Sequence, residues 1–135
     1  MKRRVILIGL AVVLLAAALV IGNLKDTVRL SGVLEGDNAQ EVTITITRTN
    51  FDKLFNRMSK NMTVAGEQVN YEYIFAGPIF EMEGYFAAPV RRMNVDGLAT
   101  QGYLLFDGDL HNAVIQTPRE MIYAASDAFI SMVLK

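Results

Sequence analysis

The sequence predicts an α+β protein: an N-terminal transmembrane helix, then a small antiparallel β-sheet domain of about six strands packed with two helices. Three observations predict this. The N-terminus is apolar, several later runs alternate apolar and polar side chains with period two, and two runs have helical periodicity. The expected element order is ββαββββα. Hairpin connections imply antiparallel pairing, and the pattern leaves open whether the sheet stays open or partly closes into a barrel.

The N-terminal segment, residues 1–22, has the features of a signal anchor. Basic residues at positions 2–4 precede residues 5–22, which carry no charged or polar side chain. As a helix, this run is about 27 Å long, close to the ~30 Å hydrocarbon thickness of a bilayer. Because basic flanks stay in the cytoplasm, residues 23–135 are expected to form one extracytoplasmic domain at the cell membrane. The alternative is cleavage near Gly22, which would give a secreted domain.

The composition of the rest of the chain excludes several classes of function. Three of the 13 basic residues lie in the N-terminal segment, so residues 23–135 carry ten basic against 14 acidic residues. Nucleic-acid binding is not expected, because it requires clustered Lys and Arg. The chain has no cysteine, which excludes disulfides, thiolate metal sites and cysteine nucleophiles.

Runs of period-two alternation predict the strands. The clearest are 27–35 and 41–48, where β-branched residues alternate with polar ones, and these two are expected to form a hairpin. Residues 87–97 contain Pro89 and are expected to be irregular. Two further hairpins are expected, one from 69–75 with 80–86 and one from 100–107 with 111–116.

Helical spacing predicts two helices. The residues from 117 to 120, Thr-Pro-Arg-Glu, have the form of a capping box with proline at the first helical position, and an apolar stripe follows as far as Val133. This predicts a C-terminal helix packed on the sheet. The other predicted helix presents on one face Phe51, Leu54, Phe55, Met58 and Met62.

Charged side chains on the predicted second hairpin and on the irregular segment that follows it form the candidate ligand or partner surface. Glu81 and Glu83 share one strand face, about 6–7 Å apart, and Glu72 can join them from the neighbouring strand. Arg91 and Arg92 are the only adjacent basic pair beyond the N-terminus and can pair with these carboxylates. Carboxylate pairs also occur in glycoside hydrolases and calcium sites, but a solvated sheet face is the simpler interpretation.

The remaining polar features do not form a catalytic, metal or cofactor site. His111 is the only histidine, and it lacks the partner and nucleophile of a triad. The Asp-Gly-Asp run at 107–109 is a tight turn rather than a calcium loop, because the downstream glutamate of such a loop is missing. No cofactor and no metal are therefore expected.

Three functional hypotheses follow. The first is a non-enzymatic, membrane-tethered binding or interaction domain of the cell envelope, anchored to the bilayer by residues 5–22 and contacting a protein partner or ligand. The second is a carrier or sensor of a small apolar ligand. The third is a small hydrolase that uses Glu81, Glu83 or His111. The second hypothesis requires an internal cavity lined by Tyr71, Tyr73, Phe80 and Phe106.

Overall fold

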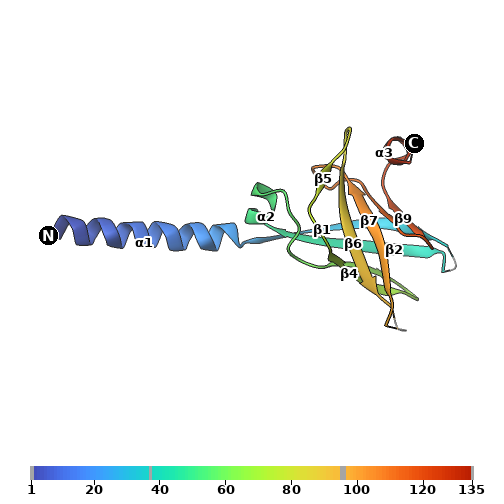
Figure 1. Ribbon diagram of the computed structural model, residues 1–135, viewed down its shortest axis with the longest axis horizontal. Coiled ribbons are helices and arrows are strands. Elements are labelled where there is room, and N and C mark those ends of the chain that lie inside the picture. Colours follow the sequence, from blue (N-terminus) through green and yellow to red (C-terminus); the bar gives the residue numbers. More distant parts are fainter. Residues whose placement is uncertain (1, 37, 95–96, 135) are drawn as a thin grey trace.

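The computed structural model, which describes residues 2–36, 38–94 and 97–134, shows a β-barrel that extends from the end of a long helix (Figure 1). The helices are α1 (Lys2–Gly22), α2 (Asn50–Leu54) and α3 (Asp127–Val133). The strands are β1 (Lys25–Glu35), β2 (Gln40–Thr49), β3 (Met62–Gly66), β4 (Asn70–Phe75), β5 (Phe80–Glu81), β6 (Phe86–Met93), β7 (Ala99–Phe106), β8 (Ala113–Gln116) and β9 (Met121–Ala124).

Eight of these strands form a closed antiparallel barrel. Their order is β4-β3-β2-β1-β9-β8-β7-β6, and β4 also pairs with β6, which closes the ring. The short strand β5 adds to β6 outside this ring. The predicted small sheet of about six strands is therefore wrong. Strands β1 and β9 are distant in the sequence, and β5 lies between β4 and β6 along the chain. No local pattern therefore reveals either pairing.

Two of the predicted hairpins are confirmed. Strands β1 and β2 pair continuously from Lys25 opposite Thr49 to Leu34 opposite Gln40. Strands β7 and β8 pair from Tyr103 opposite Gln116 to Phe106 opposite Ala113. In both hairpins the side chains alternate between the barrel interior and the outside, as period-two patterns require.

The predicted hairpin of 69–75 with 80–86 is wrong. β4 pairs with β3 on one side and with β6 on the other, whereas β5 is only two residues long and pairs with β6. Residues 87–97 were expected to be irregular because of Pro89, yet β6 extends through Met93; residues 95 and 96 lie outside the described part. The Pro89 carbonyl accepts a hydrogen bond from the Ala76 amide, so this proline still contributes to the β4–β6 junction.

The helix predicted from the apolar spacing of residues 51–62 is much shorter in the structure. α2 ends at Leu54, and Asn56 adopts the left-handed conformation (φ 50°) that ends helices. Met62, the last member of the apolar face, instead starts β3 and is fully buried in the barrel. An apolar residue 11 positions after Phe51 fits a helix face and an inward strand position equally well.

The predicted C-terminal helix is divided into a turn, a strand and a short helix. Thr117 makes a turn, in which its hydroxyl accepts a hydrogen bond from the Glu120 amide at 3.2 Å. Ile122 and Ala124 then point into the barrel as members of β9, which pairs with both β8 and β1. Only α3 remains helical, capped by the Ser126 hydroxyl. The predicted capping box is therefore wrong, because the same spacing also suits a polar turn before a strand.

Apolar side chains fill the barrel. An eight-stranded barrel has an interior just wide enough for side chains to occupy. Tyr73, Phe106 and Leu104 lie there, each at most 1% exposed. On the outside, α3 packs over Leu105 and Val114 through Phe129.

The helix α1 projects from the barrel with exposed side chains along its length (Figure 1). Within the described residues it is the one helix long and apolar enough to cross a membrane. Only Asn23 and Leu24 separate it from β1.

The assignment of β9 predicts that Ile122 is a core residue. Ile122→Ala should lower the free energy of unfolding by about 2–5 kcal/mol, because it leaves a cavity in the barrel. Met93→Ala, at an exposed position, should change it by no more than about 0.5 kcal/mol. Urea unfolding of the full chain in detergent micelles, followed by circular dichroism, measures both. Equal effects would contradict the strand assignment.

Candidate functional site

The barrel wall has an incomplete junction between β4 and β6. The two strands pair only where Ile74 lies opposite Arg91 and Phe75 opposite Val90. Within the described residues, no strand pairs with the β6-facing edge of 70–73 or with the facing edge of 92–93. We call this gap between two strand edges the open seam.

A groove of about 870 Å³ follows the open seam. Its lining is rich in donors and carries one carboxylate, Glu72, which accepts a hydrogen bond from Asn61 at 2.6 Å. Arg91 and Arg119 are both exposed at this groove. The local charge is therefore positive, although the domain as a whole is acidic. Arginine and asparagine residues make up much of the lining: Arg91, Arg92, Arg119, Asn61, Asn70 and Asn94.

Arg92 fills the interior side of the open seam. Its guanidinium bonds the Glu120 carboxylate at 2.5 Å and the Tyr73 hydroxyl at 3.0 Å, and it lies 3.8 Å from the centre of the Tyr71 ring. The ion pair is nearly buried, with side chains 11% and 10% exposed. Burial alone would lower the pKa of Arg92, but the Glu120 hydrogen bond and the tyrosines outweigh it, so this pKa is raised. Arg92 therefore stays charged, and these contacts hold its guanidinium in place.

The groups around Arg92 are themselves held in place. Burial raises the pKa of Tyr73 to about 12, with Arg92 opposing the change and Glu120 adding to it. The hydroxyl is therefore protonated at neutral pH. Arg92 also donates to Asn94 at 3.3 Å, and Asn94 donates to Thr100 at 2.8 Å. This polar network gives the open seam a fixed inner wall, since buried polar groups with satisfied partners are rigid.

The structure brings together part of the predicted surface. Glu72, Arg91 and Arg92 all line the groove at the open seam. Glu81, at the end of β5, and Glu83, in the turn after it, are exposed at a different hollow beside α3. The sequence predicted Glu72, Glu81 and Glu83 on one hairpin, with Arg91 and Arg92 in the irregular segment that follows it. The predicted cluster of three carboxylates is wrong, because β4 and β5 are not paired with each other.

Barrel closure also adds groove residues that sequence reasoning missed. Arg119 comes from the turn before β9, and Asn70 and Asn94 come from strand ends. No local signal marks these residues, because they meet only when β4 approaches β6. His111 lies on an exposed turn, where its amide donates to the Asp107 carboxylate at 2.8 Å.

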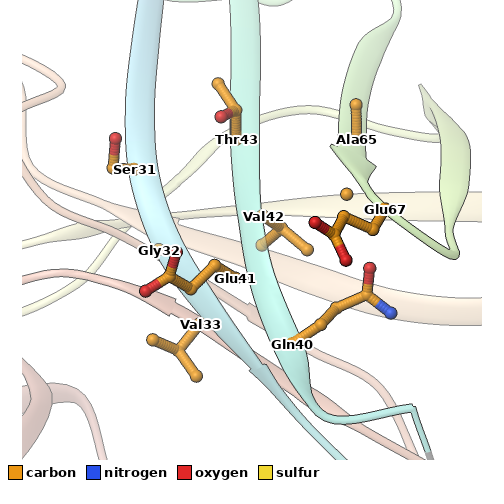
Figure 2. A pocket seen from close by; sticks show the side chains of 10 residues that line it. Ser31, Gly32, Val33, Gln40, Glu41, Val42, Thr43, Ala65 and Glu67 are labelled. Atoms are coloured by element: carbon orange, nitrogen blue, oxygen red, sulfur yellow. The ribbon is translucent and has the colours of Figure 1, made fainter.

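A second hollow lies on the outer face of β1, β2 and β3. Figure 2 shows Glu41 extending from β2 toward Gly32 of β1, and Glu67 reaching back toward Val42. The Gln40 side chain accepts from the Gln68 amide at 3.0 Å, which fixes the turn between β3 and β4. Two carboxylates are too few for a metal centre, and the described chain contains no group of three or more His, Asp or Glu that could hold a metal ion.

The aromatic residues proposed to line an internal cavity do not converge on one. Tyr73 and Phe106 are buried in the filled interior, and Tyr71 lies under Arg92 at the open seam. Phe80 is exposed on β5. The groove at the open seam is therefore the feature that combines free strand edges, charge and a fixed wall.

Compared with models of known protein families, with curated proteins and with solved structures, the chain matches none. The function is accordingly argued from this geometry.

The buried ion pair predicts a coupled effect on stability. Arg92→Met leaves the Glu120 carboxylate buried without its cation, and should lower the free energy of unfolding by about 3–5 kcal/mol. Adding Glu120→Met should restore part of that loss, because no buried charge then remains. The exposed Arg29→Met is the control. A loss for Arg92→Met no larger than the control, by urea unfolding in micelles, would show that the pair is not structural.

Proposed function

We propose that this protein is a non-enzymatic, membrane-tethered binding domain of the cell envelope, whose open seam takes up an extended, acidic segment of a protein partner. The observation that carries the proposal is the pair of unpaired strand edges beside a groove lined by arginines. Exposed edges are templates for pairing with another chain. In soluble domains they are usually covered or kept very short.

Strand addition fits the shape of the open seam. A peptide that binds by strand addition gains main-chain hydrogen bonds from an edge, and its alternate side chains enter neighbouring pockets. The β6-facing edge of 70–72 offers such a template, because Asn70 and Glu72 are exposed and the groove runs beside them, whereas Tyr73 is buried. The barrel pairing at 74–75 ends the site at one side, which sets where a bound strand would stop.

The charge of the groove selects the partner's chemistry. Arg91 and Arg119 are exposed at the groove, and Arg92 adds its charge from the interior side. Guanidinium groups bind carboxylates through paired hydrogen bonds. An extended segment that carries Asp or Glu therefore suits this groove better than a neutral or basic one.

The membrane tether rests on α1 and on how the barrel meets it. The three basic residues before the span favour a cytoplasmic N-terminus. Asn50 donates to the Ile21 carbonyl at 2.7 Å, and the Phe51 ring covers Gly22 so closely that a Cβ there would overlap it. These contacts use the end of α1 as part of the fold, which supports retention of the helix over cleavage near Gly22.

The topology supports a site that faces away from the bilayer. β1 leaves α1, and each neighbouring strand reverses direction, so β4 runs toward α1 and β6 runs away from it. The paired segment at 74–75 is therefore nearer to the helix, and the open segment at 70–73 is farther. A partner outside the membrane can reach this open segment of β4.

The other two hypotheses have less support. Tyr73 and Phe106, two of the residues expected to line a cavity, pack within the described barrel core, so they do not favour the carrier hypothesis. Glu81 and Glu83 are exposed rather than desolvated in a cleft, so nothing about them favours hydrolysis.

Site-specific photocrosslinking tests the proposal in cells that express the full chain. A benzoylphenylalanine at Asn70 should give adducts to an acidic partner peptide, whereas the same residue at Thr43, on the outer face of β2, should not. Arg91→Glu should reduce the Asn70 adduct severalfold, because it reverses a groove charge; Arg29→Glu, on β1, should leave it unchanged. Equal adducts at both positions, or an adduct that survives Arg91→Glu, would contradict the proposal.

A further inference from the structure

Beside the end of α1, the barrel carries a set of apolar side chains that face solvent. Leu54 and Phe55, at the end of α2, are 73% and 62% exposed, and Leu24, between α1 and β1, is 55% exposed. We call these three residues the apolar collar. Neighbouring large apolar residues that remain exposed mark a surface that contacts a partner or a membrane.

The apolar collar is attached directly to α1. The Asn50 amide donates to the Leu24 carbonyl at 3.2 Å, and its side chain donates to the Ile21 carbonyl at 2.7 Å. Phe51 packs on Gly22, and its ring stacks with that of Phe55 at 6.2 Å between centroids. α2 consequently lies alongside the junction of α1 and β1 (Figure 1). These contacts fix the position of α2 along the axis of α1.

Leu54 and Phe55 of the apolar collar lie in a segment whose conformation is held by hydrogen bonds. The carboxylate of Asp52 is buried and accepts hydrogen bonds from the Thr49 amide at 2.9 Å, from Ser59 at 2.7 Å and from Arg57 at 3.1 Å. Burial alone would raise the pKa of Asp52, but these hydrogen bonds outweigh it and hold the pKa below 3.8. The loop therefore keeps Leu54 and Phe55 outward at neutral pH.

The length of α1 sets the depth of the apolar collar. Its 21 residues extend about 32 Å, which matches the ~30 Å hydrocarbon layer. If Lys2 lies at one boundary, Gly22 lies at the other, and α2 lies beside it. Interfacial helices bury their apolar side chains about 5–10 Å into the headgroup and acyl boundary. The exposed cations Lys25 and Lys60 fit the anionic headgroups there.

We infer that the apolar collar is a second membrane contact: Leu24, Leu54 and Phe55 insert into the outer interface of the bilayer that α1 spans. This rests on the proposed function only in requiring that α1 crosses the membrane. The barrel then docks on the lipid surface in one orientation. Its open seam, at the far part of β4 and β6, is held away from the lipid.

Depth measurements with single cysteines test this inference, because the natural chain has none. The full chain in phosphatidylcholine–phosphatidylglycerol vesicles carries an NBD fluorophore at Phe55→Cys, at Val33→Cys or at Leu14→Cys. Val33 is the matched control, an exposed apolar residue about 26 Å along β1 from Lys25. Leu14 lies within α1. Quenching by lipids with a nitroxide near the headgroup reports proximity to the interface.

The expected result is quenching at Phe55 severalfold stronger than at Val33, with the Leu14 probe quenched best by nitroxides deep in the acyl chains. Strong deep quenching at Leu14 together with equal, weak quenching at Phe55 and Val33 would overturn the second contact and leave the membrane span intact. No lipid quenching at Leu14 would refute the span itself, and with it the inference.

Discussion

The pairing of β4 with β6 is the constraint on which the structure depends. A sheet of eight antiparallel strands leaves two edges unless its first and last strands meet. Here they pair at Ile74 and Phe75, and the Ala76 amide also donates to the Pro89 carbonyl. Beyond this short ladder, residues 70–73 and 92–93 do not pair with each other. Arg92 lies on the interior side of this open seam with its charge neutralised by Glu120. One short ladder and one buried ion pair together complete the wall.

The same arrangement stabilises the barrel and, under the proposed function, provides its binding surface. A full ladder between β4 and β6 would leave no edge for a partner, and a complete gap would expose the barrel core to water. The polar network of Arg92, Tyr73 and Asn94 seals the interior without pairing the strand edges. At the other end, under our proposals, α1 and the apolar collar orient the barrel on the membrane. The incomplete junction would then face away from the lipid.

From the sequence, two hairpins and the apolar N-terminal helix were predicted correctly, whereas the second hairpin, the C-terminal helix and the closure of the barrel were not. The β1–β2 hairpin was clear because Val42, Ile44 and Ile46 alternate with threonines in a continuous ladder. The apolar run of α1 was equally clear. By contrast, Ile122 and Met62 suit a helix face and a strand equally. Only their pairing decides between the two: Ile122 lies opposite Leu34 of β1, and Met62 lies opposite Tyr73 of β4. Arg91 and Arg92 were noted as a pair, but Arg119 reaches their groove only through closure.

Disulfide trapping across the junction tests closure most directly. The double variant Ile74→Cys with Arg91→Cys places two cysteines opposite each other in an antiparallel pair, so it should oxidise readily to an intramolecular disulfide. Glu72→Cys with Met93→Cys, two residues farther along the same strands, should oxidise much more slowly, because the open seam separates them. Non-reducing electrophoresis and mass measurement quantify both. Equal rapid oxidation would show a fully paired wall, and failure of the first pair would show that the barrel does not close there.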